Sequence, residues 1–445
     1  MGNVGQNGTP AMSTEHAIPK RFPSQLGDRI MACSDPSGEL MIQLELEFAQ
    51  QLDADRIARS VDLALDAEPV LGCRFVRHWR KPWWERLEPG ARKAFLPARD
   101  EAEYESFKAS PAAAHTGPQV SVCLLNLSDA AMLLIKVSHY AADAAGVREV
   151  SRIISSIYDK LGSDPDFVPE PNRPGSRSVG EILKGVRWTT YPRLYWQFQR
   201  DTWASQVPRA TLTLSFRDGP PEALSFINRL LPREQVSFLV DYGRKHEATL
   251  NDLLVAAFLR ALAAQAGLDG HRQLRVTTTV DCRRYVTDDQ APAVANLSLG
   301  VLGWPNLGTD LGQDFASTLA RVASITRRRK RSFVGLDNLI GFMVWPGPLP
   351  HALATRFVQQ YFGGWVRQGN FPHALTNMGA IDPSAVTYGA SPLNARLLPP
   401  PSTPPHFALG VSGYDGTLTI STGVYGIQWD MAESFLDAMV GELPH

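Results

Sequence analysis

A histidine and an aspartate four residues apart have the types and the spacing best suited to chemistry in this sequence. His139 follows the apolar run MLLIKVS, and Asp143 precedes a stretch with helical apolar spacing. An imidazole with a pKa near 6.5 can take a proton from a hydroxyl or an amine at neutral pH and pass it to a leaving thiolate. At the end of a buried strand the backbone is fixed while the side chain can face a cleft, so His139 is predicted to be a general base.

The same spacing also fits a structural role. An aspartate at the start of a helix most often accepts hydrogen bonds from free backbone N–H groups, and Ser138 could act in the same way. His139 could be a partly buried strand-end residue that is hydrogen-bonded to the backbone. On spacing alone, an H-x-x-x-D pattern favours this structural interpretation.

The composition is that of a globular protein. The chain has 445 residues, of which 44% are hydrophobic and 20% charged, enough for one large or two medium cores. Its 44 basic residues balance 45 acidic ones. We therefore expect no nucleic-acid partner and no membrane partner, and a small molecule or a protein is favoured instead.

The cysteines and the apolar runs predict a cytoplasmic location. Cys33, Cys73, Cys123 and Cys282 lie far apart, which fits neither a metal knuckle nor a disulfide framework. No apolar run reaches the ~18 residues of a membrane span, and the first 20 residues lack a signal-peptide core. Signatures of a hydrolase elbow, a P-loop, a dinucleotide fold and a zinc protease are absent, so we expect no metal and no bound cofactor.

Two lobes are predicted from the order of the elements. Residues 1–22 are expected to form a flexible tail, 23–165 an N-terminal lobe, 166–212 a linker or crossover, and 213–445 a C-terminal lobe. Strands alternate with helices in both halves, and hairpins occur among them. This pattern predicts α/β lobes of the α+β sandwich type, with a cleft between them.

Several segments carry a resemblance to a known superfamily. The stretch VSHYAADAAG resembles the H-H-x-x-x-D-G signature of condensation domains and CoA-dependent acyltransferases, which share the chloramphenicol acetyltransferase fold. ATLNDLLVAAFLRAL resembles the buried helix of the second lobe in that superfamily, TVDCRR its arginine-bearing strand, TNMG its Ser/Thr-Asn-x-Gly turn, and GYDGTLTIS its late hairpin. The resemblance runs from Phe22 to the final helix, in the order that the superfamily has.

The resemblance implies two lobes in a V with a central tunnel and assigns roles within it. His139 would be the general base, and Asp143 would be structural and turned toward Arg283. Thr376 and Asn377 would lie in the tunnel wall. The sequence departs from the signature at Ser138, which replaces its first histidine, and at Ala144, which replaces its glycine.

Ser138, Ala144 and nearby Gly146 join Thr376 and Asn377 as candidate substrate-binding residues. The methyl group of Ala144 could narrow the tunnel or alter the start of the helix.

The implied function is acyl transfer in specialised metabolism, such as nonribosomal peptide, polyketide or antibiotic biosynthesis. An acyl thioester of CoA or of a carrier protein would be the co-substrate. A small amine or alcohol would be the acceptor, which gives an amide or an ester. Two alternatives stay open. One is a degenerate docking platform without catalysis, and the other is a condensation-like cyclase or dehydratase.

A basic run and two further histidines are expected to lie at the surface or to pack, and not to take part in catalysis. RRRKR at 327–331 is interpreted as a solvated helix end, with a phosphopantetheine or carrier-protein contact as the alternative. His351 lies in polar sequence and is predicted to be a surface residue. His373, close to the TNMG turn, could approach the tunnel but is expected to pack.

Overall fold

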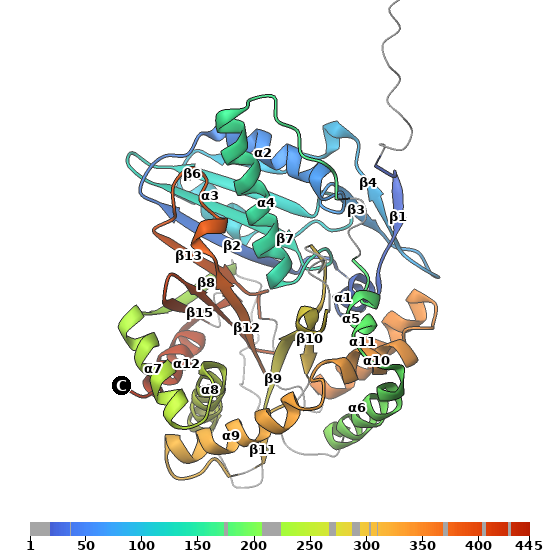
Figure 1. Ribbon diagram of the computed structural model, residues 1–445, viewed down its shortest axis with the longest axis vertical. Helices are drawn as coiled ribbons and strands as arrows, with labels where there is room; N and C mark the ends of the chain where they lie inside the picture. The colour runs from blue at the N-terminus through green and yellow to red at the C-terminus, as the bar shows by residue number, and fades with distance from the viewer. Residues whose placement is uncertain are drawn as a thin grey trace, which may run out of the picture.

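The computed structural model describes residues 18–445 except 36, 173–176, 207–223, 267–272, 287–293, 302–303, 309, 368–372, 403–405 and 426–428. It has two lobes, each built on a sheet, and they lie one above the other in Figure 1. The predicted mixed fold of two lobes is confirmed.

The N-terminal lobe is a five-stranded sheet between helices, with the strand order β13-β2-β7-β6-β5. Helices α2 (Ala54–Ala67) and α4 (Ala144–Ser163) pack on one face, and α3 (Glu101–Ala109) packs on the other. The strands are β2 (Met41–Phe48), β5 (Phe95–Ala98), β6 (Val120–Asn126), β7 (Ala131–Ser138) and β13 (Asn394–Leu398). Strand β7 is central and covered on both faces, which explains its almost continuous apolar sequence.

Strand β13 joins this sheet from the far end of the chain. It pairs antiparallel with β2, so a segment of the range expected to be the C-terminal lobe, 213–445, completes the N-terminal sheet. The tail prediction covered 1–22, and residues 1–17 lie outside the described residues. Arg21 and Phe22 instead belong to β1 (Arg21–Pro23) of a three-stranded sheet with β3 (Cys73–Val76) and β4 (Trp83–Arg86).

The crossover predicted for 166–212 contains helices. They are α5 (Gly180–Lys184) and α6 (Tyr191–Gln206), and α6 packs against α10 (Leu336–Val344). Helices α1 (Leu26–Ser34) and α11 (His351–Arg367) lie beside them on the right of Figure 1. The chain is therefore structured over much of its passage between the lobes.

The C-terminal lobe is built on a sheet with the order β10-β9-β12-β14-β15-β8, to which β11 adds by pairing with β9. Its strands are β8 (Leu224–Leu231), β9 (Leu274–Asp281), β10 (Ser298–Val301), β11 (Asn306–Gly308), β12 (His373–Ile381), β14 (Ala408–Tyr414) and β15 (Thr417–Tyr425). Helices α7 (Arg233–Lys245), α8 (Leu250–Ala266), α9 (Phe315–Lys330) and α12 (Trp429–Gly441) complete it. Short 3₁₀ turns are η2 (Pro89–Ala91), η3 (Trp188–Thr190), η4 (Cys282–Tyr285) and η5 (Pro383–Ala385).

Two segments that carry the resemblance form the elements it implies, a buried helix and a hairpin. Helix α8 is buried almost all round, as its apolar sequence predicts, and the Thr249 N–H donates to Asp252 at its start over 2.9 Å. Asp415 and Gly416 form the turn between β14 and β15, with φ of 43° and 81°.

A candidate active site where the lobes meet

His139 stands directly after β7, and its backbone is held in place. Its N–H donates to the Leu40 carbonyl over 2.9 Å. The ring Nδ1 lies 3.1 Å from the Ala142 carbonyl oxygen. A carbonyl can only accept, so the proton is on Nδ1 and the lone pair is on Nε2. That tautomer is the one that a general base acting through Nε2 requires.

The environment keeps the imidazole neutral. Burial lowers the pKa of His139 below its ordinary value, and the nearby Asp143 carboxylate and the Ala142 carbonyl oppose this effect only in part. At pH 7 the ring is therefore unprotonated on Nε2 and ready to accept a proton.

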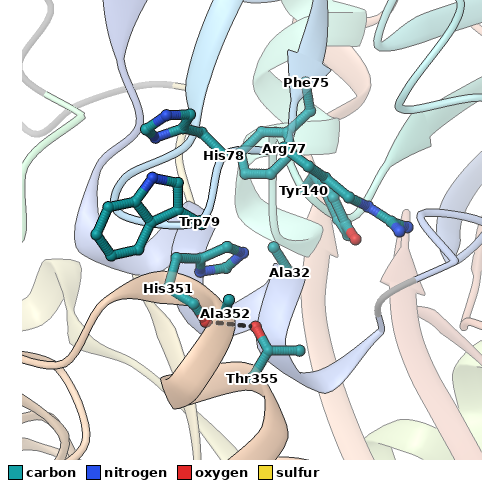
Figure 2. Close-up of a pocket in the computed structure, with 9 residues that line it drawn as sticks. All are labelled: Ala32, Phe75, Arg77, His78, Trp79, Tyr140, His351, Ala352 and Thr355. Atoms are coloured by element: carbon teal, nitrogen blue, oxygen red, sulfur yellow. Dashed lines mark hydrogen bonds between the residues drawn. The ribbon is translucent and has the colours of Figure 1, made fainter.

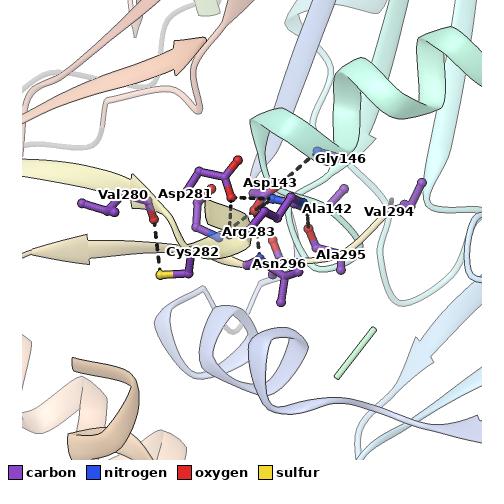
Figure 3. Close-up of polar contacts among 12 residues, drawn as sticks. Ala142, Asp143, Gly146, Val280, Asp281, Cys282, Arg283, Val294, Ala295 and Asn296 are labelled. Carbon is purple, nitrogen blue, oxygen red and sulfur yellow. Dashed lines mark hydrogen bonds and ion pairs between the residues drawn. The ribbon is translucent and has the colours of Figure 1, made fainter. Parts of the chain in front are cut away.

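Asp143 ties the start of α4 to the C-terminal lobe. Its Oδ1 accepts from the Gly146 N–H over 2.9 Å, which caps the helix. Its Oδ2 accepts from the backbone N–H groups of Leu297 and Ser298, over 2.8 and 2.7 Å. The carboxylate thus holds both the loop after His139 and the segment that leads into β10 (Figure 3).

Arg283 completes this arrangement, as the resemblance implied. Its Nη1 donates to Asp143 Oδ2 over 2.9 Å and lies 3.2 Å from Asp281 Oδ1, while Nη2 donates to the Ala295 carbonyl over 2.9 Å. Burial by itself would raise the pKa of Asp143, but the charge of Arg283 and the donated hydrogen bonds hold that pKa below its usual value. Asp143 is therefore ionised at neutral pH.

His139 lines a cavity of about 460 Å³ whose walls come from both lobes. A cavity of this size can hold the reacting part of a small ligand. Its lining includes Met31, Leu40, Ile42, His139, Asp143, Ala144, Ala145, Arg148, Thr279, Asp281, Ser298, Gly300, Ala374, Thr376, Asn377, Met378, Gly379, Pro399, Pro400, Pro401, His406 and Ala408. Three of the expected substrate-binding residues, Ala144, Thr376 and Asn377, are thus brought to the same cavity as His139.

Two others are not brought to this cavity. Ser138 is buried, and its Oγ accepts from the Tyr140 N–H over 3.3 Å, so it supports the turn after β7. Gly146 lies inside the first turn of α4. A Cβ there would come within 2.8 Å of the Ala142 Cβ, which explains the glycine by close packing.

Sequence reasoning missed Arg148 and His406, which both line the cavity. Arg148 lies one helical turn after Ala144, so this spacing could have placed both on one face of α4. Its guanidinium donates to the Ala380 carbonyl and fills the space beside Gly379, where a Cβ would come within 2.8 Å of Nη1. Burial lowers the pKa of Arg148, which still leaves a cation in the cavity wall. No comparable signal marks His406.

The prediction that His351 is a surface residue is wrong. It is 8% exposed and lines a separate cavity of about 420 Å³ beneath β3 and the Tyr140 turn (Figure 2). Its Nδ1 lies 3.8 Å from the Cys33 Sγ. Burial, together with two nearby arginines, lowers the pKa of His351 to about 4, and burial raises the pKa of the Cys33 thiol. The pair is neutral at pH 7 and does not form a nucleophilic thiolate.

The basic run and His373 behave nearly as expected. Four residues of the run 327–331 are exposed at the end of α9, whereas Arg329 is buried and lies 2.6 Å from the Asp337 carboxylate. His373 is fully buried, and its Nδ1 accepts from the Phe407 N–H over 3.2 Å. It packs at the start of β12 and does not line the cavity of His139.

Comparisons with known proteins bear on the fold. No family model matches the sequence. A curated relative, nonribosomal peptide synthetase 5 of Gibberella zeae, is 24% identical over 172 residues, which are 37% of this chain. The chain spans only 2% of the length of that synthetase.

Solved structures match over almost the whole chain. Polyketide synthase associated protein 5 of Mycobacterium tuberculosis superimposes with a TM-score of 0.64 at 15% identity, over 95% of this chain and all of that one. The TRI3 trichothecene 15-O-acetyltransferase of Fusarium sporotrichioides gives 0.68 at 11% identity, over 95% of each chain. The first condensation domain of the calcium-dependent antibiotic synthetase gives 0.64 at 16%, over 95% and 97%. The chain therefore has the two-lobed fold of condensation domains and related acyltransferases.

Neither a membrane-spanning helix nor a metal-binding cluster occurs among the described residues. Within the described ranges, no helix is long and apolar enough to cross a bilayer. Over the same part of the chain, no three histidine, cysteine, aspartate or glutamate side chains lie close enough together to hold a metal ion.

Proposed function

We propose that this chain is an acyltransferase of the condensation type, which moves an acyl group from a thioester to an amine or a hydroxyl. The observation that carries the proposal is the His139 ring, which lines a cavity between the lobes with Nδ1 held by the Ala142 carbonyl. The fold that the chain shares with condensation domains and an acetyltransferase supports the reaction class.

The proposed reaction needs only groups of the chain and two substrates. Nε2 of His139 takes the proton of the acceptor N–H or O–H while that nitrogen or oxygen attacks the thioester carbonyl carbon. A tetrahedral intermediate forms, and its collapse breaks the C–S bond. The leaving thiolate then takes the proton from the imidazolium, which restores the neutral ring. Donor and acceptor approach the ring already oriented by the walls of the cavity.

The residues around His139 have supporting roles in this proposal. Asp143 and Arg283 are positioning residues, because their ion pair holds the loop that aims the imidazole. Asn377 accepts from the Gly379 N–H over 3.0 Å through Oδ1, so its amide NH₂ can turn to the cavity. With Thr376 it supplies hydrogen-bond donors for the oxyanion of the intermediate. Arg148 adds positive charge to the same wall.

The thioester comes from CoA or from a phosphopantetheinyl carrier protein, and one assay tests both. Each acylated donor is incubated with a small amine or alcohol, and intact-mass analysis follows the loss of the acyl group and the appearance of the amide or ester. We expect transfer by the native protein, and a ~100- to 10,000-fold slower rate for His139→Ala, which is the typical worth of a general base.

The control variant is His246→Ala. His246 is an exposed histidine at the end of α7, away from the cavity, and its replacement should leave the rate unchanged. A His139→Ala protein as active as the native one would refute the role of the imidazole. A native protein that transfers no acyl group from either donor would favour the docking platform, and an intramolecular product would favour the cyclase.

A further inference from the structure

A second cavity, of about 400 Å³, lies beside the one that contains His139. We call it the aromatic chamber. Helices α1, α6, α9, α10 and α11 and strand β10 contribute to its walls. Seven aromatic side chains line it: Tyr195, Phe198, Phe342, Trp345, Phe357, Tyr361 and Phe362. Nothing in the proposed chemistry at His139 uses these residues.

The rings of the chamber pack on one another and leave a space lined mainly by apolar groups. Trp345 and Phe357 meet edge to face at 5.5 Å between centroids, and Phe357 stacks on Tyr361 at 6.2 Å. The charged groups of the wall are paired: Arg329 lies 2.6 Å from the Asp337 carboxylate and also contacts Asp201. The space is therefore suited to an uncharged apolar ligand.

The chamber shares a wall with the His139 cavity. Gly300 of β10 lines both. Its neighbours alternate as a strand requires, because Leu299 lines the chamber and Ser298 lines the cavity. Successive residues of helix α1 also line different cavities: Ile30 lines the chamber and Met31 lines the cavity of His139.

At Gly300 the two cavities share a residue that contributes only backbone to both linings. A Cβ added at Gly300 would meet only the Thr277 Cγ2, at 3.8 Å, so the position has room for a larger residue. Trp345 and Phe357 at the chamber are 47% and 37% exposed, so both rings present apolar surface that an apolar ligand could cover.

We infer that the aromatic chamber binds the apolar chain of a substrate whose reacting group lies at His139. This inference rests on the proposed function and extends it to the substrate class. At ~30 Å³ for a group the size of a water molecule or a methylene, the 400 Å³ of the chamber corresponds to roughly thirteen such groups, so an aliphatic chain of about twelve carbons fits. The chain belongs either to the acyl donor or to the acceptor, and the experiment separates the two.

Binding is measured first, without turnover. Dodecanol is titrated against the native protein by calorimetry and against Val358→Trp, which fills the chamber from α11. Ser34→Trp is a second filling variant, from an exposed position on the chamber wall, in case the core substitution impairs folding. Val240→Trp, at an exposed position of α7, is the matched control. We expect the native protein and the control to bind dodecanol, and both filling variants to bind at least ~30-fold more weakly.

Catalysis is measured next, with Gly300→Leu adding a side chain at the residue that the two cavities share. The native protein should prefer a dodecanoyl over an acetyl thioester by at least ~100-fold in kcat/KM, since each buried methylene is worth about fourfold. Gly300→Leu should reduce this preference at least ~30-fold. The second arm compares dodecylamine with ethylamine as acceptor, using an acetyl donor. The control is Gly90→Leu, at an exposed turn where a Cβ meets nothing within 4 Å.

The outcomes distinguish this inference from the proposed function. Dodecanol that does not bind, or that binds equally to the filling variants, overturns the inference. A preference for long chains that Gly300→Leu leaves unchanged in both arms also overturns it. A protein that binds dodecanol in the chamber but transfers no acyl group refutes the proposed function, while the binding still supports an apolar-chain site. A loss of preference in the donor arm alone assigns the chain to the acyl group, and a loss in the acceptor arm alone assigns it to the amine.

Discussion

Replacement of Arg283 by alanine should destabilise the protein through the carboxylate that it leaves behind. Asp143 is 2% exposed, and Arg283 supplies its one opposite charge within 4 Å among the described residues. In Arg283→Ala the carboxylate keeps the N–H donors of Gly146, Leu297 and Ser298 but loses its countercharge. The Ala295 carbonyl also loses the donor that reaches it over 2.9 Å.

The expected loss follows from these contacts. Removal of one partner of a buried ion pair costs about 3–5 kcal/mol, because an unpaired charge remains. The three remaining backbone donors stabilise the carboxylate in part, so we expect the lower end, about 3 kcal/mol of the free energy of unfolding.

The difference in stability between the native protein and Arg283→Ala should depend on pH in one direction. In the native protein the pKa of Asp143 is below its ordinary value, so its contribution to stability is present above pH 3.8 and is lost as the pH falls further. In Arg283→Ala burial dominates and raises that pKa, so the carboxyl takes up a proton as the pH falls from 7 toward 4.5. The difference in stability between the two proteins should therefore shrink over this range.

Urea denaturation at pH 7 and at pH 4.5 measures both quantities. The matched control is Arg244→Ala, which breaks an exposed pair in which Nη1 lies 2.6 Å from Asp241. An exposed pair of this kind is worth less than about 1 kcal/mol. If Arg283→Ala loses no more stability than this control, or if its loss grows as the pH falls, the account of Asp143 as a buried ionised anchor is wrong.

Two further predictions concern pH. The acid limb of kcat/KM should have its midpoint below pH 6.5, because burial lowers the pKa of His139; a midpoint above that pH in the rate profile of the native protein would contradict this. Glu68→Gln should raise the free energy of unfolding by up to about 3 kcal/mol at pH 8 and by little at pH 5. Burial raises the pKa of Glu68 from 4.5 to about 7, so its favourable contribution holds at low pH and is lost as the pH rises through 7. Glutamine keeps the oxygen that accepts from Asn172 over 2.6 Å, and equal gains at both pH values in chemical denaturation would count against this reasoning.

The regular elements were largely predictable, because their signals are local. The apolar run of β7 and the uniform apolar surface of α8 each predict burial from consecutive residues alone. The position of β13 was not predictable in this way. Its five residues have no local signal that distinguishes a partner in the N-terminal sheet from one in the C-terminal sheet, since strand pairing is decided by the rest of the fold.

The site residues also differ in how far local sequence predicts them. The sequence by itself placed His139 at a strand end and Asp143 at a helix start, because both follow from the spacing of neighbouring residues. The resemblance added Arg283 as the partner of Asp143, and the structure brings the two together. The sequence could not show that Ala144 lines the cavity while Ser138 and Gly146 support the turn and the start of the helix. Side-chain direction depends on the exact path of the backbone.

The remaining features were decided by tertiary structure alone. The backbone N–H groups of Leu297 and Ser298 donate to Asp143, which is more than 150 residues earlier in the chain. No sequence pattern in either segment predicts this contact. Gly300 lines two cavities only because α1, β10 and the helices around α10 pack as they do. Local spacing fixes which residues can share a face of one element, whereas the volume between elements is set by how their faces pack against one another. The aromatic chamber is therefore a property of the packed lobes, and the sequence of any one segment does not contain it.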